Sequence, residues 1–157
     1  MNCIIPKPAL IREGEGHFTL TGLTNVYVDP GSSALLAIGQ YLGDRLRAST
    51  GYPLAVLPHT GAPAAGHVLL LLDGEANALG EEGYELEVTP ASVRLSAFRP
   101  AGLFHGVQTL RQLLPPAVEA TTLQPGPWHI PAFAIRDVPR FIWRGAKHDD
   151  ATRNNVV

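Results

Sequence analysis

Apolar and polar residues alternate in several short segments of this chain, and this alternation is the pattern of strands with one buried face. It is clearest in residues 84–88 and 92–96, which a short connection around Pro90 separates. A period of two with a tight connection predicts an antiparallel hairpin. Other short segments, most of them bounded by turn residues, predict strands at 17–20, 25–28, 54–57 and 67–72.

Two longer segments change to apolar spacings of three and four residues, which predict amphipathic helices. The first covers residues 32–51, with a serine to cap its start and a glycine to end it. Gly39 and Gly43 lie four residues apart inside it, and we expect this stripe of small residues to allow close packing. The second covers residues 100–114, between a proline suited to a first helical turn and a pair of prolines that stops the helix.

The sequence also indicates where two of the strands lie in the sheet. Residues 68–72 read V-L-L-L-L, which predicts a central strand buried on both faces. Residues 128–138 are apolar but contain Pro131, which favours either an edge strand or a loop-strand-loop segment. The order of elements predicts an α+β fold, a two-layer sandwich in which a mixed, mainly antiparallel sheet carries both helices on one face.

Length and composition agree with one domain, because the chain has 157 residues, of which 45% are hydrophobic and 17% charged. The formal net charge of -2 leaves no positive surplus for phosphates, so no nucleic-acid partner is expected. Cys3 is the single cysteine, so neither an intramolecular disulfide nor a thiol cluster is expected. Residues 1–10 lack a signal-peptide pattern, no apolar run is long enough to cross a membrane, and no compartment is indicated.

Few residue patterns point to chemistry. The histidines show no metal-ligand spacing, and the polar setting of residues 148–150, H-D-D, favours a solvated charge cluster over a cation site. We therefore expect no metal and no cofactor. The acids Glu81 and Glu82 are flanked by glycines, which favours a solvated turn over a catalytic pair. We expect His105 to flank the second helix with a local hydrogen-bond partner.

Four motifs are more specific, and they follow one another in the order of a known domain. They are I-I-P-K-P at 4–8, G-Y-E-L-E-V at 83–88, G-L-F-H-G-V-Q-T-L-R-Q-L-L-P at 102–115 and W-H-I-P-A-F-A-I-R-D-V-P-R-F-I-W-R-G at 128–145. Together they resemble the family-20 glycoside hydrolases, the β-N-acetylhexosaminidases, in the amino-terminal non-catalytic domain and its junction with the catalytic barrel. Q-T-L-x-Q-L-L also resembles the leading domain of family-84 N-acetylglucosaminidases, whereas P-R-F-I-W-R-G favours family 20.

The resemblance implies that residues 1–145 form this accessory domain, with a zincin-like arrangement of sheet and helices. Its implied partner is a (β/α)8 barrel, whose adjacent Asp-Glu pair acts on the glycosidic bond. This chain has no such pair and departs from the family pattern after Gly145. Residues 146–157 are therefore expected to be a polar tail where the barrel would begin, and no catalytic residue is expected. Arg144 matches a sugar-contacting arginine, which implies substrate binding only if the barrel is present.

Three functions remain open at this stage. The first is an accessory domain or fragment, inactive alone, of an enzyme that hydrolyses terminal N-acetylhexosamine from glycoconjugates or chitin oligosaccharides. The second is a free-standing carbohydrate-binding module, in which Trp128, Phe141 and Trp143 stack on sugars, although the same aromatics are expected to pack toward the barrel. The third is an interaction module that self-associates through an apolar patch near the carboxy end.

Overall fold

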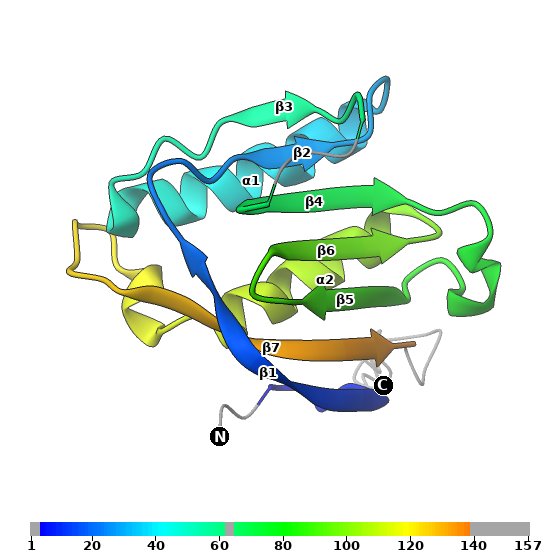
Figure 1. Cartoon of the computed structure of the whole chain (residues 1–157). Coiled ribbons are helices and arrows are strands. Elements are labelled where there is room, and N and C mark those ends of the chain that lie inside the picture. Colours follow the sequence, from blue (N-terminus) through cyan, green and yellow to red (C-terminus); the bar gives the residue numbers. More distant parts are fainter. Residues whose placement is uncertain (1–3, 62–64, 139–157) are drawn as a thin grey trace, which may run out of the picture.

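A computed structural model describes residues 4–61 and 65–138 of the chain. Within them, seven strands form one sheet and two α-helices cover one of its faces (Figure 1). The elements are β1 (Leu10–Leu20), β2 (Val26–Val28), α1 (Ser33–Thr50), β3 (Val56–Pro58), β4 (His67–Leu72), η1 (Ala76–Leu79), β5 (Tyr84–Val88), β6 (Ser92–Ala97), α2 (Pro100–Leu113), η2 (Pro116–Glu119) and β7 (Trp128–Asp137). The predicted α+β class is confirmed.

The sheet has an antiparallel half and a parallel half, in the order β1-β7-β5-β6-β4-β2-β3. Pairing is antiparallel from β1 through β7 and β5 to β6, and parallel from β6 through β4 and β2 to β3. β2 and β3 run parallel because α1 returns the chain across the helical layer between them, as a parallel connection requires. The predicted hairpin is β5 and β6, and the sheet is mixed as predicted.

The last strand is not at an edge, so that part of the prediction is wrong. β7 lies between β1 and β5. Its pairing with β5 covers only the segment from Phe133 to Asp137, so at Pro131 the strand has a neighbour on the β1 side alone. Since proline has no backbone N–H to donate, it is tolerated where one side of the strand is unpaired. An interior strand can therefore contain this proline.

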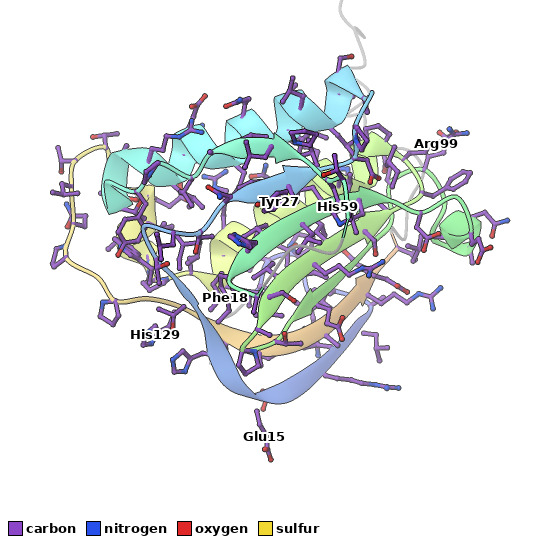
Figure 2. The ribbon with its side chains drawn as sticks, turned by 45° about the horizontal axis from the view of Figure 1, so that its top comes forward. Glu15, Phe18, Tyr27, His59, Arg99 and His129 are labelled. Atoms are coloured by element: carbon purple, nitrogen blue, oxygen red, sulfur yellow. The ribbon has the colours of Figure 1, made fainter. Side chains whose placement is uncertain are left out.

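β1 is longer than predicted, because its polar first half also pairs with β7. The prediction began at residue 17, whereas the strand begins at Leu10. Its register shifts between Glu13 and His17, and Gly16 has a φ of 83° within this bulge. Glu15 points away from the molecule at the bend of the strand (Figure 2). Exposed charges and a bulge are ordinary features of an edge strand. They interrupt the alternation of apolar and polar residues, so the sequence pattern does not reveal this part of the strand.

The prediction that the apolar segment 68–72 is buried on both faces is also wrong. β4 lies inside the sheet, between β6 and β2. Val68 and Leu70 are buried toward the helices, whereas Leu69 and Leu71 are only half-buried. The difference arises because both helices cover the same face, so the outward residues of β4 lie on the open face.

The helices begin and end where the sequence predicts. The Ser32 hydroxyl accepts the Leu35 N–H at 3.3 Å, and Gly51 ends α1 in a left-handed conformation with a φ of 71°. A Cβ on Gly39 would lie 2.8 Å from Val56, so this part of the small-residue stripe does allow α1 to lie close to the sheet. The core fills the space between the sheet and the two helices, with Trp128 among its largest buried side chains.

Candidate functional site

The residues that the sequence singles out near the carboxy end do not gather in a site. Arg144, Phe141, Trp143 and the predicted boundary at residue 145 lie outside the described residues. Trp128 is only 2% exposed, because it begins β7 on the core side of the sheet. It cannot stack on a sugar or on a partner domain, so both roles considered for it are wrong.

The other candidates are at the surface, away from any enclosed site. Glu81 is exposed in the turn that links η1 to β5, and Glu82 is half-buried beside it. His105 is half-buried on α2, with its ring 6.4 Å from that of Phe104. The described residues offer His105 no hydrogen bond, so the predicted local partner is wrong.

Neither a metal site nor a membrane span is present in the part of the chain that the structure describes. Across residues 4–61 and 65–138, no three histidine, cysteine, aspartate or glutamate side chains lie close enough together to hold a metal ion. None of the described helices has the length and apolar character needed to cross a membrane. The remaining candidates for a functional site are the two broad surfaces of the molecule.

The outer surface of the helical layer, which we call the helix face, carries exposed apolar side chains. Phe104 on α2 is 41% exposed, Leu36 on α1 is 47% exposed, and Ile5 lies at the end of α2, where its backbone N–H and C=O bond to the Gln112 side chain. The ring of Tyr41 lies 5.4 Å from that of Phe104 and joins the two helices. Exposed apolar side chains on both helices make this surface a candidate interaction site.

Arg111 fixes the arrangement of this face. Its guanidinium donates to the Tyr41 hydroxyl at 2.7 Å, to Gln108 Oε1 at 2.7 Å, and from Nε to Glu119 Oε1 at 2.9 Å. Hydrogen bonding to Glu119 raises the pKa of Arg111. One side chain thereby links α1, α2 and η2.

The opposite surface, which we call the open face, is the side of the sheet that the described helices leave uncovered (Figure 1). A single row of cross-strand neighbours runs across it from β1 to β3: Arg12, Ala134, Glu87, Arg94, Leu69, Tyr27 and Leu57. The antiparallel half of the row is largely charged and the parallel half is apolar. The open face therefore has two chemically different halves.

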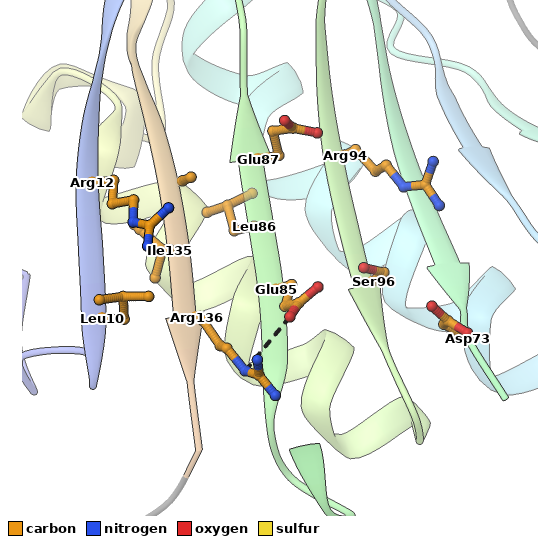
Figure 3. A pocket seen from close by; sticks show the side chains of 11 residues that line it. Leu10, Arg12, Asp73, Glu85, Leu86, Glu87, Arg94, Ser96, Ile135 and Arg136 are labelled. Atoms are coloured by element: carbon orange, nitrogen blue, oxygen red, sulfur yellow. Dashed lines mark ion pairs between the residues drawn. The ribbon is translucent and has the colours of Figure 1, made fainter. Parts of the chain in front are cut away.

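A hollow of about 510 Å³ lies in the charged half (Figure 3). Its charged lining residues are three arginines and three acids: Arg12, Arg94, Arg136, Asp73, Glu85 and Glu87. Arg136 Nε and Glu85 Oε1 are 3.5 Å apart, and both side chains are about half exposed, so this ion pair is loose. Sequence reasoning missed this hollow, because its residues come from five separate segments.

Comparisons with known proteins identify the family of this chain. The family described as glycosyl hydrolase family 20, domain 2, matches residues 2–138. The chain belongs to this family. The match selects family 20 over the family-84 resemblance of the α2 motif.

Relatives that match the chain are much longer than it is. A β-N-acetylhexosaminidase from Cellulomonas fimi is 35% identical over 150 residues, which are 94% of this chain and 28% of the relative. The structure of the family-20 β-N-acetylhexosaminidase from Streptomyces coelicolor is 44% identical with a TM-score of 0.81, over 90% of this chain and 27% of that chain. The structure of Streptomyces plicatus N-acetyl-β-hexosaminidase is 46% identical with a TM-score of 0.82, and the match again covers 90% of this chain and 27% of that chain.

The family-20 chain therefore spans little more than a quarter of these relatives. It corresponds to their non-catalytic amino-terminal domain. The predicted recognition is confirmed, and the helix face and open face are the two surfaces of this domain.

Proposed function

We propose that this chain is the accessory domain of a β-N-acetylhexosaminidase and that it is inactive alone. The observation that carries the proposal is the extent of the match, which covers domain 2 of the family and 27–28% of the relatives named above. The partner is the (β/α)8 catalytic barrel. The substrate of the complete protein is a terminal N-acetylhexosamine on a glycoconjugate or chitin oligosaccharide. Arg144 keeps its proposed sugar contact only when the barrel is present.

The helix face is the better surface for the catalytic barrel. Domains held together in one chain pack through apolar area, and Phe104, Leu36 and Tyr41 supply it there. Much of the open face instead carries charged groups, which would lose their hydration in an interface. The proposed junction is therefore the helix face, and the buried Trp128 takes no part in it.

A chimera tests this function. In it, the chain replaces the corresponding domain of the Streptomyces coelicolor enzyme. Phe104→Ser should leave the stability of the isolated chain nearly unchanged, because the ring is already 41% exposed, but should lower the melting temperature of the chimera by several degrees. Both melting temperatures are measured by calorimetry.

The matched control is Leu57→Ser, which removes an exposed apolar side chain from the open face. It should lower neither melting temperature by a comparable amount. Equal effects of the two substitutions on the chimera would contradict docking through the helix face.

A further inference from the structure

We propose that the hollow in the open face is a saccharide-binding subsite for a chain of N-acetylhexosamine units. The choice of sugar rests on the proposed function. The existence of the site rests on the shape and unpaired groups of the hollow. Its volume of about 510 Å³ lies within the range of roughly 300–1,000 Å³ that is usual for small-molecule sites.

The hollow exists because small residues stand between long ones. Ala134 on β7 lies between Arg12 on β1 and Glu87 on β5 in one cross-strand row. Ser96 on β6 lies beside Glu85 in the next row. Figure 3 shows the long side chains around this space. The small residues form the floor, and the arginines and glutamates form the rim.

Several polar groups of the hollow have no partner within the protein. The side chains of Arg12, Glu87 and Arg94 make no hydrogen bond or ion pair with any described residue, although Glu87 and Arg94 are direct cross-strand neighbours. Ser96 is only 8% exposed, and its hydroxyl also lacks a partner in this part of the chain. No fully buried polar side-chain atom of the described residues is unsatisfied, so this hydroxyl opens into the hollow.

The charges of the hollow fit a neutral ligand. Three arginines and three acids give no net charge, whereas a site for phosphate or an acidic peptide would have a positive surplus. A sugar hydroxyl both donates and accepts a hydrogen bond, so it can satisfy a guanidinium and a carboxylate that stand side by side. Arg94 and Glu87 are cross-strand neighbours that both line the hollow.

An apolar surface continues directly from the hollow. After Arg94, the same row passes to Leu69 and then to Tyr27, whose ring meets that of His67 edge-on at 5.2 Å. Since neighbouring strands lie about 4.8 Å apart, Tyr27 is roughly 10 Å from Arg94 across the sheet. A sugar ring has polar edges and an apolar face, so a short oligosaccharide can use the hollow and this platform together.

The test is an NMR titration of the isotope-labelled chain with N,N′-diacetylchitobiose. We expect saturable shifts of the amide signals of residues 85–87, 94–96 and 134–136. Arg94→Ala should weaken binding about tenfold, because a hydrogen bond to a charged group is lost. Ala134→Trp should abolish binding, because the indole would fill the hollow.

The matched control is Ala37→Trp, which adds the same side chain at an exposed position of α1 on the opposite side of the sheet. It should bind as the unmodified chain does, and the signal dispersion of each spectrum shows whether the variant is folded. Cellobiose, which has hydroxyls in place of the acetamido groups, is the comparison ligand, and tighter binding of cellobiose would contradict the choice of N-acetylhexosamine. Saturation without shifts on this face, no saturation at all, or unchanged binding by Ala134→Trp would overturn the inference.

The two proposals fail separately. An active chimera combined with no binding of chitobiose would remove the subsite and leave the accessory function intact. Binding at the hollow combined with a folded but inactive chimera would leave the subsite intact and remove the accessory function.

Discussion

At the scale of residues, a buried hydroxyl pair joins α2 to the sheet. The Tyr84 hydroxyl on β5 and the Thr109 hydroxyl on α2 are 2.5 Å apart, and both residues are buried. Burial raises the pKa of Tyr84 to about 12, the nearby Asp137 carboxylate adds to the rise, and the hydrogen bond with Thr109 opposes it. The folded protein therefore holds the phenol proton more tightly than the unfolded chain does.

This difference predicts a pH dependence. The Tyr84 contribution to stability is fully present below pH 10, the pKa of a free tyrosine, and is lost as the pH rises to about 12. Tyr84→Phe should cost about 1 kcal/mol at neutral pH, and its free energy of unfolding should fall less between pH 10 and 12 than that of the unmodified chain. Urea unfolding across this range measures both, with Tyr27→Phe as control. Parallel curves for the Tyr84→Phe variant and the unmodified chain would contradict the assignment.

Gly102 shows how closely α2 approaches the sheet. A Cβ added there would lie 2.1 Å from the backbone oxygen of Gly83, so part of the backbone would have to move. Gly102→Ala should destabilise the chain by roughly 1–3 kcal/mol through overpacking. Gly74→Ala, at a position with no atom within 4 Å of the added Cβ, should change stability little. Chemical unfolding measures the stability of both variants. An unchanged stability of Gly102→Ala would show that the contact between α2 and the sheet is looser than described.

At the scale of elements, the sequence predicts best where local chemistry decides the structure. The caps of α1, the proline that begins α2 and the hairpin of β5 and β6 all depend on residues close in the chain, and all are confirmed. The position of β7 and the first half of β1 depend on pairing between distant segments, which no local pattern reveals. The hollow escapes prediction for the same reason, because Arg12, Glu87 and Arg94 meet only in the folded sheet.

Arg111 carries a prediction at this scale, because it links three elements. Arg111→Lys keeps the charge but loses the planar fork that reaches Glu119 and Tyr41 together, so we expect a loss of about 1 kcal/mol. Arg12→Lys, at an exposed arginine without a partner among the described residues, is the matched control and should be neutral. Urea unfolding compares the two, and equal effects would show that the fork does not hold α1, α2 and η2 together.

At the scale of the whole molecule, the two proposals assign different roles to the two surfaces. The helix face has the apolar side chains that a covalently attached catalytic domain would cover. The open face keeps unpaired polar groups in the hollow, available to a saccharide. Self-association through a patch near the carboxy end stays a prediction, because that patch includes residues beyond 138. A concentration-independent monomer in sedimentation would count against it.

The most direct measurement compares hydrolysis of a chromogenic N-acetylglucosaminide by the chain alone and by the chimera with the Streptomyces coelicolor catalytic part. The chain alone should show no turnover above the buffer rate, and the chimera should approach the rate of the natural enzyme. Turnover by the purified chain that disappears when one of its own residues is substituted would contradict the account, as would a folded chimera without activity.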